Sequence, residues 1–175
     1  MTESEVEEYK ALRATIRERG SVRACVFVAG MAAWALVALA ATFVSIPLMA
    51  VLPLLLLAAT FEAVFALHVG VERIGRYLQV FYDDRWEQTA MAFGPPLAGT
   101  GSDPLFALLF GLATMANLAP VLAAAPVRVE VVAIGGAHAL FLVRLVVARR
   151  VAGRQRAADL ERFRQIKNPP VEGRS

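Results

Sequence analysis

Four apolar runs constrain the fold of this 175-residue chain more than any other feature of its sequence. Each holds about 20 residues, and a helix of that length, rising about 1.5 Å per residue, crosses a hydrocarbon core of about 30 Å. Hydrophobic residues make up 58% of the chain, above the roughly 45–50% of an average soluble domain, which agrees with membrane spans. The sequence predicts transmembrane helices over residues 24–44, 48–69, 105–124 and 127–148.

The links between these runs predict how the helices are arranged. The first and second runs are separated by a very short link, and so are the third and fourth, so each pair must form an antiparallel hairpin. The stretch 84–104 joins the hairpins and is rich in Gly and Pro, which is typical of a loop. We therefore expect one domain, an all-α integral membrane four-helix bundle made of two helical hairpins.

Helical patterns continue beyond the apolar runs on one side of the predicted membrane. Thr2 with Glu5, and Ser4 with Glu7, form overlapping capping boxes at the start of an amphipathic segment. Apolar residues also recur at helical spacing after the second and fourth runs. The sequence predicts three helical extensions, over residues 3–20, 70–83 and 149–167, the second continuing its span or bending along the headgroups.

Basic residues predict the orientation of the bundle. The chain has 16 arginines and 2 lysines, and 16 of these 18 residues lie on the side of the three extensions. Arg128 lies at the opposite end, and Arg144 lies within a span. Lys and Arg concentrate on the cytoplasmic side of membrane proteins, so we expect both termini in the cytoplasm. The excess of arginine over lysine suggests a GC-rich bacterial genome, and hence a bacterial inner membrane.

Four polar residues inside the predicted spans form a candidate intramembrane cluster: Glu62, His138, Arg144 and Asn117. By helical rise from the outer ends, Glu62 lies about 21 Å deep, between His138 at about 17 Å and Arg144 at about 26 Å. Ionisable residues inside a membrane are rare and default to a functional hypothesis. We expect Glu62 to face inward and to pair with Arg144 or His138. Such a pair either fixes helix register or forms a proton-transfer site, and the sequence leaves both open.

A second group of polar residues lies at the predicted cytoplasmic boundary: His68, Glu72, Arg73 and Arg76. His68 and Glu72 share a helical face, but two ligands are too few for a metal site. His68 and His138 differ in depth by about 13 Å, which argues against a haem shared between them. We expect no metal and no cofactor.

The extensions have three interpretations. Their apolar stripes pack on one another and cap the bundle, or one stripe binds another protein, or the basic surface of the extensions rests on anionic lipids. The arginines alternate with acidic residues and accompany no recognition motif, so we expect no nucleic acid partner. The expected partners are membrane lipid and another membrane or cytoplasmic protein, or a second copy of this chain. The candidate partner-binding stripe comprises Ile74, Tyr77, Leu78, Phe81 and Trp86.

Three functions remain open at this point. The preferred one is an interaction, assembly or signalling subunit that acts through its cytoplasmic helices, because the predicted outer loops are minimal. The second is an oligomeric proton, ion or small-solute transporter or channel that uses Glu62 and His138. The third is an interfacial membrane enzyme, but no nucleophile motif or metal-ligand set emerges, so we assign no catalytic residue.

Overall fold

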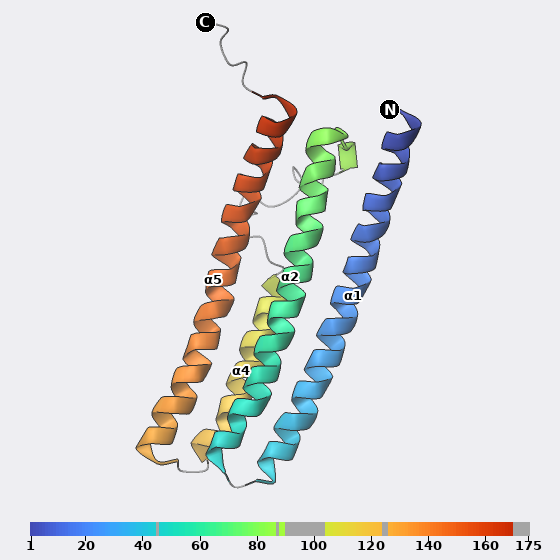
Figure 1. Cartoon of the computed structure of the whole chain (residues 1–175). Helices are drawn as coiled ribbons and strands as arrows, with labels where there is room; N and C mark the ends of the chain where they lie inside the picture. Colours follow the sequence, from blue (N-terminus) through green and yellow to red (C-terminus); the bar gives the residue numbers. More distant parts are fainter. Residues whose placement is uncertain (45, 87, 90–103, 124–125, 170–175) are drawn as a thin grey trace, which may run out of the picture.

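The computed structural model describes residues 1–44, 46–86, 88–89, 104–123 and 126–169 (Figure 1). The fold is an all-α bundle, as expected, and the described residues contain no strand. Most of the predicted loop 84–104, and Arg174, lie outside the described residues. The helices are α1 (Glu3–Thr42), the short 3-10 helix η1 (Pro47–Ala50), α2 (Val51–Phe81), α4 (Pro104–Ala123) and α5 (Arg128–Lys167).

Two pairs of elements that the sequence pattern separates are single helices in the structure. Helix α1 joins the segments 3–20 and 24–44, and α5 joins 127–148 and 149–167, so each is 40 residues long. No proline interrupts either helix, so the backbone hydrogen bonds continue through the change from polar to apolar sequence. Thr2 and Glu5 form the expected capping box, in which the Thr2 hydroxyl accepts from the Glu5 amide at 3.3 Å.

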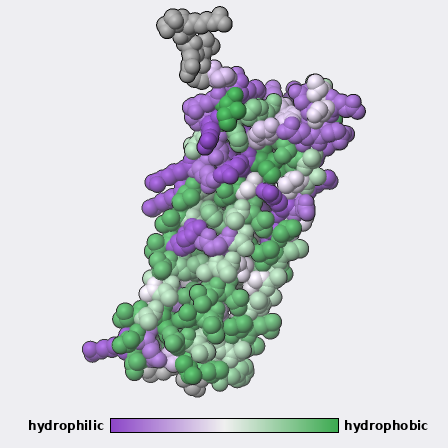
Figure 2. All heavy atoms as spheres, in the orientation of Figure 1, coloured by the Kyte–Doolittle hydropathy of each residue, from purple (hydrophilic) through white to green (hydrophobic). Residues whose placement is uncertain are grey.

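Among the residues that the structure describes, three helical segments are long and apolar enough to cross a membrane, namely α1, Pro47–Phe81 and α5. Their composition indicates a membrane location. The described apolar part of α4, Ala107–Ala123, is shorter. Figure 2 shows hydrophobic residues covering the lower part of the visible face and hydrophilic residues gathered at the upper end. We call residues 24–42, 47–69, 104–123 and 128–148 the hydrophobic section, and residues 3–20, 70–86 and 149–167 the polar extension.

Helix α2 is the central element of the bundle. It contacts α1, α4 and α5, and Figure 1 shows it running between α1 and α5 along most of their length. Helix α4 accompanies the other three only through the hydrophobic section, so the polar extension is built from three helices. The ends of α1 and α5 that carry the termini lie at the same end, and both hairpin turns lie at the other.

Aromatic rings join α2, α4 and α5 in the hydrophobic core. The Phe61 ring lies 5.3 Å from that of Phe110 and 6.0 Å from that of Phe141, both in edge-to-face geometry. This geometry suits the ring quadrupoles and contributes beyond the burial of apolar area. The Phe27 ring of α1 meets Phe110 at 5.8 Å. The other buried members of this cluster are Leu54, Leu57, Ala113, Leu145 and Ala148.

One glycine sets the distance between α1 and α2. A Cβ atom built on Gly30 would lie 2.8 Å from the Thr60 Cβ and closer still to the other two Thr60 side-chain atoms. Rotation of the Thr60 side chain does not move the Thr60 Cβ, so it cannot relieve this clash. Only glycine at position 30 therefore allows the two helices to come this close. Small residues allow helix backbones to pack closely in membranes. The two helices therefore approach each other closely at Gly30 and Thr60, within the hydrophobic section.

Candidate functional site

The four polar residues predicted to form one intramembrane cluster form two separate pairs. The first is an ion pair between α5 and α2, in which Arg144 Nη2 donates to Glu62 Oε2 at 2.7 Å. The Arg144 guanidinium also lies over the Phe61 ring at 5.7 Å and the Phe65 ring at 5.3 Å. Of the two partners considered for Glu62, the structure brings Arg144 to it.

This ion pair lies on the outside of the bundle, whereas the sequence predicts that Glu62 faces inward. The side chains of Glu62 and Arg144 are 48% and 36% exposed. Phe61 occupies the core, and the next residue of a helix is rotated by about 100°, so Glu62 points away from the interior. The pair is therefore a charged site on an apolar surface.

The second pair is buried and joins three elements. Asn117 of α4 donates from Nδ2 to the Ala50 carbonyl at 2.8 Å, and its Nδ2 lies 3.0 Å from His138 Nε2. His138 of α5 is 2% exposed, and its Nδ1 lies 2.7 Å from the Ile134 carbonyl. A carbonyl only accepts, so Nδ1 carries the proton and Nε2 accepts from Asn117. These contacts give both ring nitrogens of His138 a hydrogen-bond partner. We call Asn117 and His138, with their bonds to Ala50 and Ile134, the buried clip, which lies away from Glu62.

The residues predicted at the boundary form a charged network between α2 and α5. Arg76 is only 4% exposed, and it donates to Glu72 at 3.2 Å and to Asp159 at 3.0 Å. Arg73 also reaches Asp159, at 3.3 Å, and Arg156 binds Glu72. Three guanidinium groups thus share two carboxylates. The structure thus brings together the predicted α2 residues Glu72, Arg73 and Arg76. Their partners on α5 could not be inferred from the sequence, because it does not show which face of α2 meets α5.

His68 links this network to α1. Its Nδ1 lies 2.8 Å from Arg23 Nη1, and its Nε2 lies 3.6 Å from Glu72 Oε1. Among the residues that the structure describes, no group of three or more His, Cys, Asp or Glu side chains could hold a metal ion. The arrangement around His68 is a polar contact between helices.

Most side chains of the candidate partner-binding stripe pack against other residues of the polar extension. Leu78 is fully buried. The Phe163 ring of α5 meets those of Tyr77 at 5.7 Å and Phe81 at 6.2 Å. Ile74 is half-buried. Trp86 differs from the other four because it is 69% exposed.

A buried carboxylate anchors the chain next to Trp86. Asp84 accepts from Arg13 Nη2 at 2.7 Å and from the Tyr9 hydroxyl at 3.0 Å, both on α1. Its other carboxylate oxygen accepts from the Trp86 amide at 3.0 Å. Asp83 reverses the chain just before, with a φ of 49°, a conformation that Asp tolerates better than most residues. Tyr9, Arg13 and Asp84 were not singled out from the sequence, which gives no sign that they meet.

Two tyrosines near these anchors have altered acidity. The Tyr77 hydroxyl donates to Glu8 Oε1 of α1 at 3.0 Å. Burial, and then this carboxylate, raise the pKa of Tyr77, because both disfavour the charged phenolate. The same causes raise the pKa of Tyr82 to about 12. Both phenols therefore remain neutral at physiological pH.

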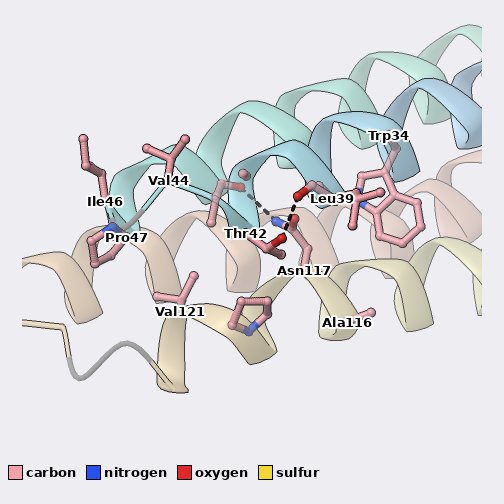
Figure 3. A pocket seen from close by; sticks show the side chains of 13 residues that line it. Trp34, Leu39, Thr42, Val44, Ile46, Pro47, Ala116, Asn117 and Val121 are labelled. Atoms are coloured by element: carbon pink, nitrogen blue, oxygen red, sulfur yellow. Dashed lines mark hydrogen bonds between the residues drawn. The ribbon is translucent and has the colours of Figure 1, made fainter.

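A cavity of about 580 Å³ lies near the hairpin turns, between α1, η1 and α4 (Figure 3). Its walls are mostly apolar, and the polar groups in them come from Trp34, Thr42 and Asn117. Asn117 is occupied by its bond to Ala50, and Thr42 donates to the Leu39 carbonyl at 2.6 Å. Trp34 Nε1 is buried without a partner among the described residues. The cavity suits an apolar chain, such as part of a lipid.

Comparison of the chain with protein-family models, with curated proteins and with solved structures found no match.

Proposed function

We propose that this protein is a small polytopic protein of the bacterial inner membrane, with both termini in the cytoplasm, and that it acts as an interaction, assembly or signalling subunit through its polar extension. Positively charged segments flank the hydrophobic section at the end that carries both termini, and such segments favour the cytoplasmic side. In the described part of the chain, the opposite end consists of helix ends and two short connections, which offer little surface to a partner.

The observation that carries this proposal is the exposure of Trp86 on an anchored part of the polar extension. The Asp84 contacts hold the backbone at Trp86 in place. A partner that binds the exposed indole therefore has less backbone freedom to restrict, which lowers the entropy cost of binding. Phe81 lies about 50 Å along the helix from Leu48, beyond the roughly 40–45 Å of a bilayer with its headgroups. The end of α2 that precedes Trp86 therefore lies beyond the expected headgroup layer. Exposed tryptophans dominate many protein interfaces.

The internal contacts of the extension suit the same role. Ring contacts of Tyr77 and Phe81 with Phe163, and the bond from Tyr77 to Glu8, tie α1, α2 and α5 together. A preorganised surface binds with a smaller entropy cost than a flexible one. The extension therefore has the properties of a rigid platform.

The polar residues of the hydrophobic section give transport less support. A transport path would use Glu62 and His138 together, but Glu62 is half exposed on the outer surface and His138 is buried as a satisfied neutral imidazole. Solute flux in proteoliposomes that disappeared in Glu62→Gln would favour transport over the proposed function. The described residues also offer no metal-ligand group for an interfacial enzyme.

The test is the native mass of the protein extracted from its own membranes in mild detergent. We expect a reproducible second polypeptide with the unaltered chain, and its loss in Trp86→Ala. Ile166→Ala is the matched control, because Ile166 is another exposed apolar residue of the extension. A mass explained by identical chains alone, or a partner retained in Trp86→Ala, would contradict the proposal.

A further inference from the structure

A small cavity lies beside the charged network of the polar extension. It has a volume of about 180 Å³ and is lined by residues of α1, α2 and α5. Arg76, Arg156 and Gln79 supply nitrogen donors to its wall, and Glu72 supplies the one carboxylate. Ile16, Val71 and Gly75 complete the lining. The volume is sufficient for a phosphate group.

Positive side chains outnumber negative ones in the described wall of this cavity. The wall holds the guanidinium groups of Arg76 and Arg156 and the carboxylate of Glu72. Arg76 is 4% exposed, so its charge is largely removed from water. A buried charge is costly unless it is compensated. Arg23 lies against His68, which in turn lies 3.6 Å from Glu72, and adds a further positive charge nearby.

One donor of the buried arginine has no acceptor. Arg76 uses Nη1 for Glu72 and Nη2 for Asp159, but its Nε is buried without a hydrogen-bond partner among the described residues. Leaving a buried donor unpaired is costly, and more so when the group is charged. An anion in the adjoining cavity would place a negative charge beside the Arg76 and Arg156 guanidinium groups.

The depth of the cavity suggests the source of that anion. Glu72, which holds the Arg76 guanidinium, lies about 36 Å along the helix from Leu48, just past a hydrocarbon core of about 30 Å. This is the level of lipid headgroups, and basic pockets between helices at this level bind anionic headgroups. Arginine is well suited to phosphate because its planar fork presents several donors.

We propose that this cavity is a binding site for a phosphate-bearing anion, with Arg76 and Arg156 as its main ligands and Gln79 as a neutral donor. The bound group is either the headgroup of an anionic phospholipid or free phosphate. The site is independent of Trp86, so it does not rest on the proposed function.

The experiment measures the melting temperature of the full chain, purified and delipidated in a neutral detergent, against ligand concentration. The probes are dihexanoylphosphatidylglycerol, the zwitterionic dihexanoylphosphatidylcholine, and inorganic phosphate. We expect a saturable rise with phosphatidylglycerol and none with phosphatidylcholine. A similar rise with inorganic phosphate would support the same site with free phosphate as its ligand. No rise with either anion would overturn the proposal.

Variants separate this site from general attraction of anions to a basic protein. Arg156→Gln removes one ligand, and we expect the dissociation constant of the effective anion to rise at least tenfold. Arg162→Gln is the control, because it removes the same charge from an exposed position of α5 that does not line the cavity, and we expect less than a twofold change. Gln79→Glu keeps every arginine and adds a negative charge to the wall, so it should also weaken binding tenfold or more. Equal effects of Arg156→Gln and Arg162→Gln, or unchanged binding in Gln79→Glu, would overturn the proposal.

Discussion

The Glu62–Arg144 pair is unusual because both partners lie on the outer surface of the hydrophobic section. In water an exposed ion pair contributes little, because solvent screens the charges. In hydrocarbon each charge is expensive by itself, so separation of the pair is strongly disfavoured. The stacking of Arg144 over Phe61 and Phe65 shields one side of the guanidinium. The pair thus links α2 to α5 by making each charge dependent on the other.

Removal of one charge should therefore cost more than removal of both. We expect Glu62→Gln and Arg144→Gln each to lower the free energy of unfolding by about 1–3 kcal/mol, because each leaves a charge without its partner. The double variant should lie closer to the unaltered protein than the sum of the two single effects. Unfolding in mixed micelles measures all four proteins. Glu7→Gln, which breaks the exposed Glu7–Lys10 pair, should change stability by less than about 0.5 kcal/mol.

The Asn117 amide is the group on which the buried clip depends. Asn117→Ala removes the donor of both the Ala50 carbonyl and His138 Nε2, so we expect it to destabilise the protein by about 1–3 kcal/mol. Thr114→Val is a matched change on the same helix. Thr114 donates only to the Phe110 carbonyl of its own helix, so its loss should have a much smaller effect. Thermal unfolding in detergent distinguishes the two, and equal effects would contradict the clip.

At the scale of the helix, the contact between α1 and α2 depends on the missing side chain of Gly30. Gly30→Val would force the helices apart at Thr60, and we expect a loss of about 1–3 kcal/mol, as for other overpacked sites. Gly20 lies on the same helix, and a Cβ atom added there would have nothing within 4 Å. Gly20→Ala should therefore stabilise the protein by about 0.5–1 kcal/mol through helix propensity. Chemical denaturation of both variants provides the measurement, and similar effects of the two changes would exclude a close approach at Gly30.

The sequence predicts the helices better than it predicts their faces. Long apolar runs and the Thr2 capping box locate the elements, because both signals are local in the chain. The position of Glu62 on the outer surface depends on which side of α2 meets α5, which a single apolar helix does not reveal. The same limit applies to Asp84 and Asp159, whose partners lie on other helices and far away in the sequence. The estimated depths correctly placed Arg144 near the level of Glu62. They also grouped His138 with this pair, although His138 binds Asn117 instead.

At the scale of the whole molecule, the proposed orientation can be tested with single cysteines. In a Cys25→Ala background, Ser4→Cys marks the end with the termini and Ile46→Cys marks the first hairpin turn; both positions are exposed. A membrane-impermeant maleimide added to intact cells should label Ile46→Cys at once and Ser4→Cys only after permeabilisation. This result follows from the concentration of arginine at the end with the termini. The reverse labelling pattern would reject the proposed orientation.

The two short hairpin turns have a consequence for how the chain enters the membrane. Whichever side holds the termini, insertion has to carry only these turns across the bilayer, because both lie at the same end (Figure 1). The first turn carries no charge, and near the second Arg128 is offset by Glu130. Moving a single charge across the membrane involves about 2.3 kcal/mol per 100 mV of potential. The turns carry no net charge, so the electrical work of moving them across the membrane is close to zero, and the potential acts mainly on Glu62 and Arg144, which have opposite charges and lie within the spans.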